Sequence, residues 1–186
     1  NDNLGTNSVV AQLLAGKVPV MSASDLYLNE HREYGLSTYS LHSDGSGVCY
    51  SSRLRPILNM RPKYRHWLSP SLWQLNADLH LTDWLEEKGL DFDVVTDEDL
   101  HIEGVDLLNR YQCVLTGSHP EYSSEKMLAA YESYQLQGGR WIYLGADGFY
   151  WISEYHPDNI NIIEVRKGEA GTRAWTANPG EYNNAF

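Results

Sequence analysis

The 186-residue sequence has no apolar run long enough to cross a membrane and no signal-peptide pattern. It has only two cysteines, Cys49 and Cys113, in unlike contexts, which argues against a disulfide framework and favours a reducing cytoplasm. Basic residues are scarce: 14 Lys and Arg against 25 Asp and Glu give a net charge of -11. This charge argues against binding to nucleic acid or to an anionic membrane surface.

Several short site motifs are absent as well. The sequence has no Gly-x-Gly-x-x-Gly fingerprint and no P-loop Lys-Ser/Thr, so nucleotide binding has little support. It also lacks the Gly-x-Ser-x-Gly nucleophile elbow and the His-Glu-x-x-His zinc helix. The turn at 145–148 therefore indicates only a tight turn whose backbone lines a pocket.

What the sequence does contain is a succession of helical and strand patterns joined by short links. Helices are expected at 72–88 and 123–137, with a short helix around Leu107 and Leu108. Strands are expected at 17–23, 90–94, 113–115, 141–144 and 160–165. This order predicts the α/β class, with a mostly parallel sheet flanked by helices.

No repeat, low-complexity tract or boundary divides the chain, so residues 1–186 are expected to form a single α/β domain. The chain begins at Asn1 without a methionine and ends at Phe186 without a helix stop or a tail. We therefore expect a fragment of a larger subunit, and hence an incomplete fold.

The turn from Gly117 to Tyr122 is the strongest candidate site. It follows a strand pattern and precedes a helical one, so it is expected at the sheet edge where open α/β folds bind ligands. One interpretation is a capping box, in which Ser118 caps the next helix and Glu121 reaches back to a backbone N–H. The other makes Glu121 an anionic ligand or base and His119 a general base. The residues alone favour neither.

Two other clusters have ordinary explanations beside functional ones. The segment 39–47 holds a phenol, an imidazole and a carboxylate, but its Ser-Asp-Gly tripeptide is also typical of a plain turn. Five of the fourteen Lys and Arg residues lie between Arg53 and Arg65. They mark a subunit interface or an anion site, or else a solvated face whose charges pair with the chain's own carboxylates, which we favour.

Longer motifs resemble the large (beta) subunit of N,N-dimethylformamidase. The similar stretches span nearly the whole chain and are 36–50, 58–64, 116–122, 138–140 and 144–151. The resemblance implies an iron-dependent amidohydrolase, within a glutamine-amidotransferase-like domain of a much larger subunit. It also implies a mononuclear ferric ion held by two tyrosines and a glutamate.

Matched by motif, Tyr39 corresponds to one ligand tyrosine and Glu121 to the ligand glutamate. His119 corresponds to a histidine that helps to activate water. The family's other ligand tyrosine precedes a motif whose tail resembles Asn1-Asp2-Asn3, so we expect it just upstream of this chain, with Tyr27 as the alternative.

Two further family features bear on this chain. A second catalytic carboxylate of the family would lie beyond Phe186. The family more often has asparagine where this chain has Asp147, and this departure weakens the case for a pocket role of that side chain.

The implied chemistry agrees with the residue types. Phenolate and carboxylate are hard oxygen donors that suit ferric iron, which as a Lewis acid polarises an amide carbonyl or acidifies bound water. A neutral His119 is suited to take a proton from that water, because its ordinary pKa is near working pH. The reaction expected from the resemblance is hydrolysis of N,N-dimethylformamide to dimethylamine and formate.

The resemblance also implies partners, namely a small subunit and further copies of the large subunit, in the cytoplasm. The rival hypothesis is a non-catalytic α/β interaction domain. In that hypothesis Glu121 caps a helix, and the basic run from Arg53 to Arg65 docks a partner subunit.

Overall fold

The structure is a computed structural model, and it describes residues 23, 27, 30–34, 38, 42, 44, 48–57, 60–64, 72, 74–145 and 148–166. The helices are η2 (Arg32–Tyr34, a 3-10 turn), α3 (Leu75–Glu87), α4 (Asp97–Glu103), α5 (Val105–Leu108) and α6 (Glu125–Leu136). The strands are β1 (Tyr50–Ser52), β2 (Cys113–Leu115), β3 (Tyr122–Ser123), β4 (Arg140–Ile142), β5 (Trp151–His156) and β6 (Asn159–Val165). The described residues contain both helices and strands, interspersed along the chain, so the predicted α/β class is confirmed.

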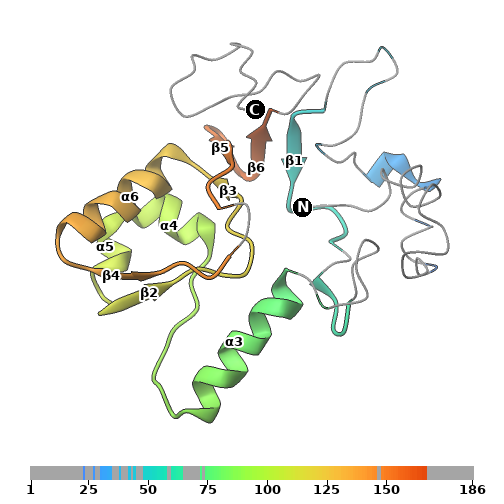
Figure 1. Cartoon of the computed structure of the whole chain (residues 1–186). Helices are drawn as coiled ribbons and strands as arrows, with labels where there is room; N and C mark the ends of the chain where they lie inside the picture. The colour runs from blue at the N-terminus through green and yellow to red at the C-terminus, as the bar shows by residue number, and fades with distance from the viewer. Residues whose placement is uncertain are drawn as a thin grey trace.

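The core lies between three helices. Leu100 on α4, Leu107 and Leu108 on α5, and Met127 and Tyr134 on α6 are all buried in one cluster. Figure 1 shows α4, α5 and α6 packed together beside β2 and β4. Burial of these large apolar side chains removes them from water and so stabilises the packing of the three helices.

The helix ends follow from local sequence. Thr96 caps α4, because its Oγ1 accepts a hydrogen bond from Asp99 N while the Asp99 carboxylate accepts one from Thr96 N. Ser124 caps α6 through a bond from Met127 N to its Oγ. Gly138, with a φ of 89°, follows the end of α6, as a glycine does where a helix stops in a left-handed turn.

The strand pairing is mixed. One sheet has the order β1-β6-β5-β3, in which β1·β6 and β5·β6 are antiparallel and β3·β5 is parallel. A second sheet is the parallel pair β2·β4, with Cys113 opposite Arg140 and Leu115 opposite Ile142. The expectation of a mostly parallel sheet therefore does not hold for the described strands. The hairpin between β5 and β6 is the reason, since a two-residue connection forces antiparallel pairing.

Two expected strands have other outcomes. The expected strand at 90–94 is wrong: the segment lies outside any sheet, and Val94 is 75% exposed. Alternation of apolar and acidic residues fits an exposed extended segment as well as a half-buried strand. The expected strand at 17–23 lies outside the described residues apart from Ala23, which is helical.

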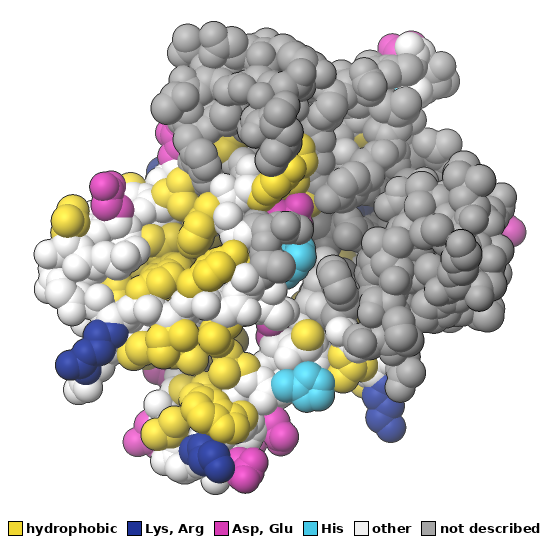
Figure 2. All heavy atoms as spheres, in the orientation of Figure 1, with side chains coloured by type: hydrophobic (Ala, Val, Ile, Leu, Met, Phe, Trp, Pro, Cys, Tyr) yellow, Lys and Arg dark blue, Asp and Glu magenta, His cyan; other side chains and the backbone are white. Residues whose placement is uncertain are grey.

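Helix α3 extends away from the helical core, with its first turn nearest the rest of the chain (Figure 1). Its surface carries large exposed apolar side chains, among them Leu79 and Trp84. In Figure 2, which has the orientation of Figure 1, hydrophobic side chains gather in the lower part of the molecule, where α3 lies. Within the part of the chain that the structure describes, no helix has the length and apolarity needed to span a membrane.

Candidate functional site

The loop from Thr116 to Glu121 connects β2 to β3 and begins at the carboxyl end of β2, as the sequence predicted. The chain after β4 runs beside it. Thr116 N donates to Ile142 O at 3.0 Å, and Thr116 Oγ1 accepts from Leu144 N at 2.9 Å. Because β2 and β4 are parallel, both connections leave the same sheet edge, which is where open α/β folds place their sites.

The approach of the two connections depends on a glycine. A Cβ built on Gly145 would lie 2.1 Å from Pro120 Cδ and 3.1 Å from Gly117 O. No larger residue fits there without moving the loop. Phe149 N then donates to Pro120 O at 2.9 Å, so the segment that leads into β5 also binds this loop.

His119 and Glu121 lie together on this loop. Nε2 of His119 is 3.3 Å from Oε2 of Glu121, and the two side chains are 18% and 14% exposed. The backbone bends tightly between them, because Glu121 N donates to His119 O at 2.9 Å. An imidazole beside a half-buried carboxylate can exchange protons with a substrate or with water, and the carboxylate can also ligate a cation.

Glu121 is held in place by Trp151 at the start of β5. The indole Nε1 donates to Oε1 of Glu121 at 2.9 Å, and Trp151 N donates to Glu121 O at 2.9 Å. A carboxylate has two oxygens and about four lone pairs, so this bond leaves it capacity as an acceptor or a ligand. Trp151 was not predicted from the sequence as a site residue. The available signal was an indole at the start of a strand, since a half-buried Trp N–H usually finds an acceptor.

The helix-cap interpretation of Glu121 is wrong. Helix α6 begins at Glu125 and its cap is Ser124, so β3 separates Glu121 from the helix. Ser118 is farther still from the helix, and Pro120 does not lie in its first turn. The Ser-x-x-Glu spacing was misread because the chain makes a short parallel pairing with β5 before it turns into the helix.

The predicted iron ligand Tyr39 lies outside the described residues, as does Asp147. Tyr27 is described and is 49% exposed, with its ring stacked 4.0 Å from that of His31. Across the described ranges, no three His, Cys, Asp or Glu side chains form a group that could hold a metal ion. His119 and Glu121 are therefore the predicted site residues that the structure brings together.

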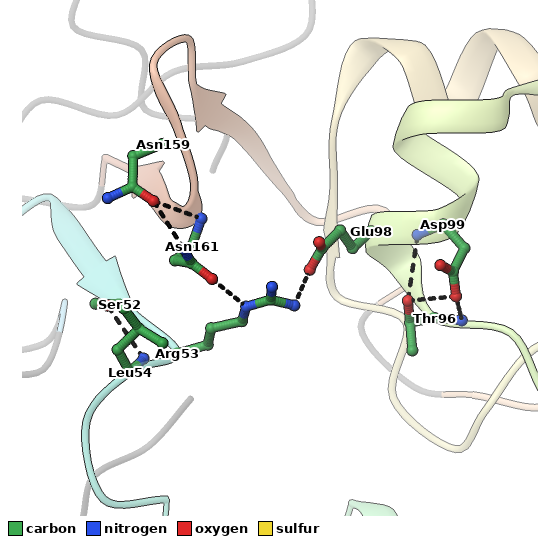
Figure 3. A network of polar contacts seen from close by, with 8 residues as sticks. All are labelled: Ser52, Arg53, Leu54, Thr96, Glu98, Asp99, Asn159 and Asn161. Carbon is green, nitrogen blue, oxygen red and sulfur yellow. Dashed lines mark hydrogen bonds and ion pairs between the residues drawn. The ribbon is translucent and has the colours of Figure 1, made fainter.

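Part of the basic run has internal partners. Arg53 forms an ion pair with Glu98 on α4, and its Nε donates to Oδ1 of Asn161 on β6 at 2.7 Å (Figure 3). For Arg53, the interpretation as a charge paired with the chain's own carboxylates is confirmed. The guanidinium of Arg61 lies 4.6 Å from the centre of the Tyr64 ring, and Arg65 is outside the described residues.

A cavity of about 200 Å³ lies elsewhere, between β1, α4 and β5. Arg53, Glu98 and Tyr155 line it, but neither His119 nor Glu121 does. Burial raises the pKa of Tyr155 to about 12, so its phenol is neutral at physiological pH. Since Arg53 and Glu98 bind each other, we interpret these polar groups as structural.

Comparison with known proteins agrees with the resemblance in the motifs. Residues 16–186 match the family described as N,N-dimethylformamidase beta subunit-like, C-terminal. The chain is 50% identical over 184 residues to the N,N-dimethylformamidase beta subunit of Paracoccus aminophilus, and 48% identical over 184 residues to that of an Alcaligenes species. Each match covers 98% of this chain and 24% of the relative, so the chain spans about a quarter of the length of these curated relatives.

Proposed function

Because the chain belongs to the N,N-dimethylformamidase beta subunit-like, C-terminal family, we propose that it supplies part of the active site of an amide hydrolase. The substrate is N,N-dimethylformamide, hydrolysed to dimethylamine and formate. The single observation that supports this best is the half-buried pair of His119 and Glu121, 3.3 Å apart, with the carboxylate held by Trp151. An unexplained acid–base pair of this kind at the carboxyl edge of a parallel strand pair is typical of a catalytic site.

In this proposal Tyr39 and Glu121 would hold a mononuclear ferric ion, and a second tyrosine, expected just upstream of Asn1 with Tyr27 as the alternative, would complete the set. The fit rests on donor chemistry. Glu121 offers a carboxylate whose position is fixed at Oε1 by the indole N–H, and hard anionic oxygens suit ferric iron. When bound, the ion supplies Lewis-acid chemistry, polarising an amide carbonyl or acidifying water.

The protein's own residues provide the rest of the mechanism. When the imidazole is neutral and its Nε2–H faces Oε2 of Glu121, Nδ1 is the nitrogen of His119 that accepts a proton from the attacking water. It can then return the proton to the amine that leaves. Glu121 orients the imidazole through the same contact, and the loop keeps both side chains largely shielded from bulk water.

The wider assembly is part of the same proposal. A large subunit containing this chain pairs with a small subunit and with further copies of itself, in the cytoplasm. Its α/β domain is of the glutamine-amidotransferase-like type, of which β2 and β4 with α6 between them form one parallel unit. The rival hypothesis, a non-catalytic interaction domain, explained Glu121 as a helix cap. That explanation does not hold, because Glu121 caps no helix.

Metal analysis and the visible spectrum of the full-length subunit, purified with its small subunit, test the proposal. Ferric phenolate is coloured, and Tyr39→Phe should bleach the protein whereas Tyr50→Phe, at an exposed position on β1, should not. Glu121→Gln should lose iron, and Glu125→Gln, an exposed carboxylate at the start of α6, is its matched control. His119→Gln should keep iron and lose turnover. A full-length protein without iron, or full iron in Glu121→Gln, would refute the ligand assignment.

A further inference from the structure

The loop that carries His119 and Glu121 is also bound by a residue from a distant helix. Asp78 lies in the first turn of α3, 40 residues before Ser118. Its Oδ1 accepts a hydrogen bond from the backbone N of Ser118 at 2.6 Å. A short N–H···O⁻ bond to a half-buried carboxylate is among the stronger hydrogen bonds in proteins.

The carboxylate of Asp78 also lies against the backbone of Gly117. A Cβ built on Gly117 would be 3.0 Å from Oδ2 and 3.1 Å from Oδ1 of Asp78. The close approach of the carboxylate to the loop is possible because residue 117 has no side chain. Gly117 and Asp78 thus fit one another, and the contact is more than a chance hydrogen bond at the surface.

The other hydrogen bonds to the loop hold its two ends, and the bond to Asp78 holds its middle. Thr116 is bound by the connection after β4, and Pro120 and Glu121 are bound by the segment that enters β5. Between these two sets lie the amide of Ser118 and the imidazole of His119. The bond from Asp78 to the Ser118 amide fixes the backbone immediately before His119, and the bonds to Pro120 and Glu121 fix it immediately after.

The ordinary explanation of Asp78 is that an acidic residue in the first turn stabilises its own helix through the helix dipole. That explanation predicts no bond to another segment. The direction of Oδ1 toward Ser118 N, and the contact with Gly117, show that the carboxylate is used outside α3.

We propose that Asp78 is a positioning residue for the site, holding the Gly117–Ser118 backbone so that the His119 imidazole stays within reach of Glu121. The inference rests on the proposed function for its catalytic consequence, but not for the anchoring itself. The contacts that carry the proposal are with the loop backbone, at Gly117 and Ser118. Asp78 acts through the Ser118 amide, and α3 is the element that brings it there.

The test compares three variants of the full-length large subunit with its small subunit. Asp78→Ala removes the acceptor. Asp78→Asn keeps an amide oxygen in the same place and serves as the conservative variant. Asp83→Ala removes the same charge from an exposed position on the same helix, and is the matched control.

Hydrogen exchange of the segment 116–121, followed by mass spectrometry, is the readout that does not depend on activity. Loss of a charged hydrogen bond should make exchange there about tenfold to a hundredfold faster in Asp78→Ala. In that variant kcat should fall by a similar factor, whereas KM should stay close to that of the wild type because no substrate contact is lost. Asp78→Asn should recover part of both, and Asp83→Ala should change neither.

Two results would overturn the proposal. One is wild-type exchange of segment 116–121 in Asp78→Ala. The other is faster exchange confined to α3, with kcat unchanged, which would leave Asp78 with only its helix-end role. These outcomes do not depend on whether the protein binds iron. If Tyr39→Phe and Glu121→Gln retained iron, the proposed function would fail. The exchange data would still decide whether Asp78 holds the loop.

Discussion

The bond between Trp151 and Glu121 gives the sharpest test of how this site is built. Replacing Trp151 with Phe removes the indole N–H that donates to Oε1 and keeps an aromatic ring at the start of β5. The ring can still pack near Tyr150, whose centroid lies 4.9 Å from that of Trp151. The backbone bond from residue 151 to Glu121 O is also kept. The substitution therefore isolates one hydrogen bond to the carboxylate.

The magnitude follows from the geometry. The bond is 2.9 Å long, its acceptor is a carboxylate, and the Glu121 side chain is only 14% exposed, so water replaces the indole poorly. Hydrogen bonds to charged groups contribute about 1.5–3 kcal/mol. Residues that orient a metal ligand through one hydrogen bond typically change metal affinity or activity by about 10–100-fold. We expect iron affinity of the full-length subunit to fall by a factor within that range.

Competition with a chelator, followed by the visible absorbance of the protein, measures this loss. Two controls separate it from a general effect of losing an indole. Trp84→Phe changes an exposed residue on α3, and Trp141→Phe changes a half-buried residue that packs on Tyr131 at 4.2 Å. Both should keep iron. The reasoning is refuted if Trp151→Phe binds iron as tightly as the wild type while Glu121→Gln does not bind it.

Two predictions concern stability. Burial, and secondarily the charge of Lys126, lowers the pKa of His101 below its ordinary value, so the unfolded chain binds more protons below about pH 6.5 and stability must fall as the pH falls from there. His101→Gln should weaken this acid-induced drop in melting temperature, and the control His80→Gln, at an exposed position, should not. Equal drops in the wild type and both variants would show that His101 is not the source of the acid sensitivity. A Cβ on Gly139 would lie 2.4 Å from the ring of the buried Tyr134, so Gly139→Ala should cost about 1–3 kcal/mol and lower the urea midpoint; an unchanged midpoint would show that the ring moves freely.

The sequence predicted the elements whose signals are local. The helix at 123–137 and the strand at 113–115 correspond to α6 and β2, and the apolar run at 160–165 falls within β6. Each has a periodic or continuous apolar pattern long enough to be decided by its own residues. The family resemblance, which rests on longer motifs, is confirmed by the match over residues 16–186.

What the sequence missed depends on contacts between distant segments. Strand β3 has only two residues, and its existence depends on pairing with β5, about 30 residues later. Strand β5 was not predicted, because between the turn expected at 145–148 and the strand expected at 160–165 no strand pattern was identified. Helix α4 has a capping box at Thr96 that was present in the sequence and was not recognised. The exposed segment at 90–94 shows the opposite error, in which a strand pattern found no partner.

The candidate site divides in the same way. Residue chemistry makes His119 and Glu121 candidates, because few residue types can be a base or a hard anionic ligand, and the family resemblance assigns their roles. For the groups that hold them, the local sequence offers only a general signal at Trp151, whose indole N–H needs an acceptor, and none at Asp78. Asp78 acts with one carboxylate of the 25 in the chain, and Trp151 with one indole of six, and nothing in the sequence distinguishes either from the others of its kind. Only the folded arrangement selects these two.

The pairing of β3 with β5 is where fold and site depend on each other most closely. Its register places Tyr122 opposite Trp151 and Ser123 opposite Ile152, which brings the indole to the carboxylate of the residue just before the strand. A shift of one residue would turn the side chains of β5 to the opposite face, and Ile152, now buried at 3% exposure, would take the place of Trp151. Burial of Ile152 therefore fixes the register, and the register fixes the position of Glu121. It follows that a substitution at Ile152 can disturb the proposed iron site without a direct contact. A polar side chain at 152 would weaken the preference for this register, and Glu121 would then lose its indole donor although both residues of that bond remain in the sequence.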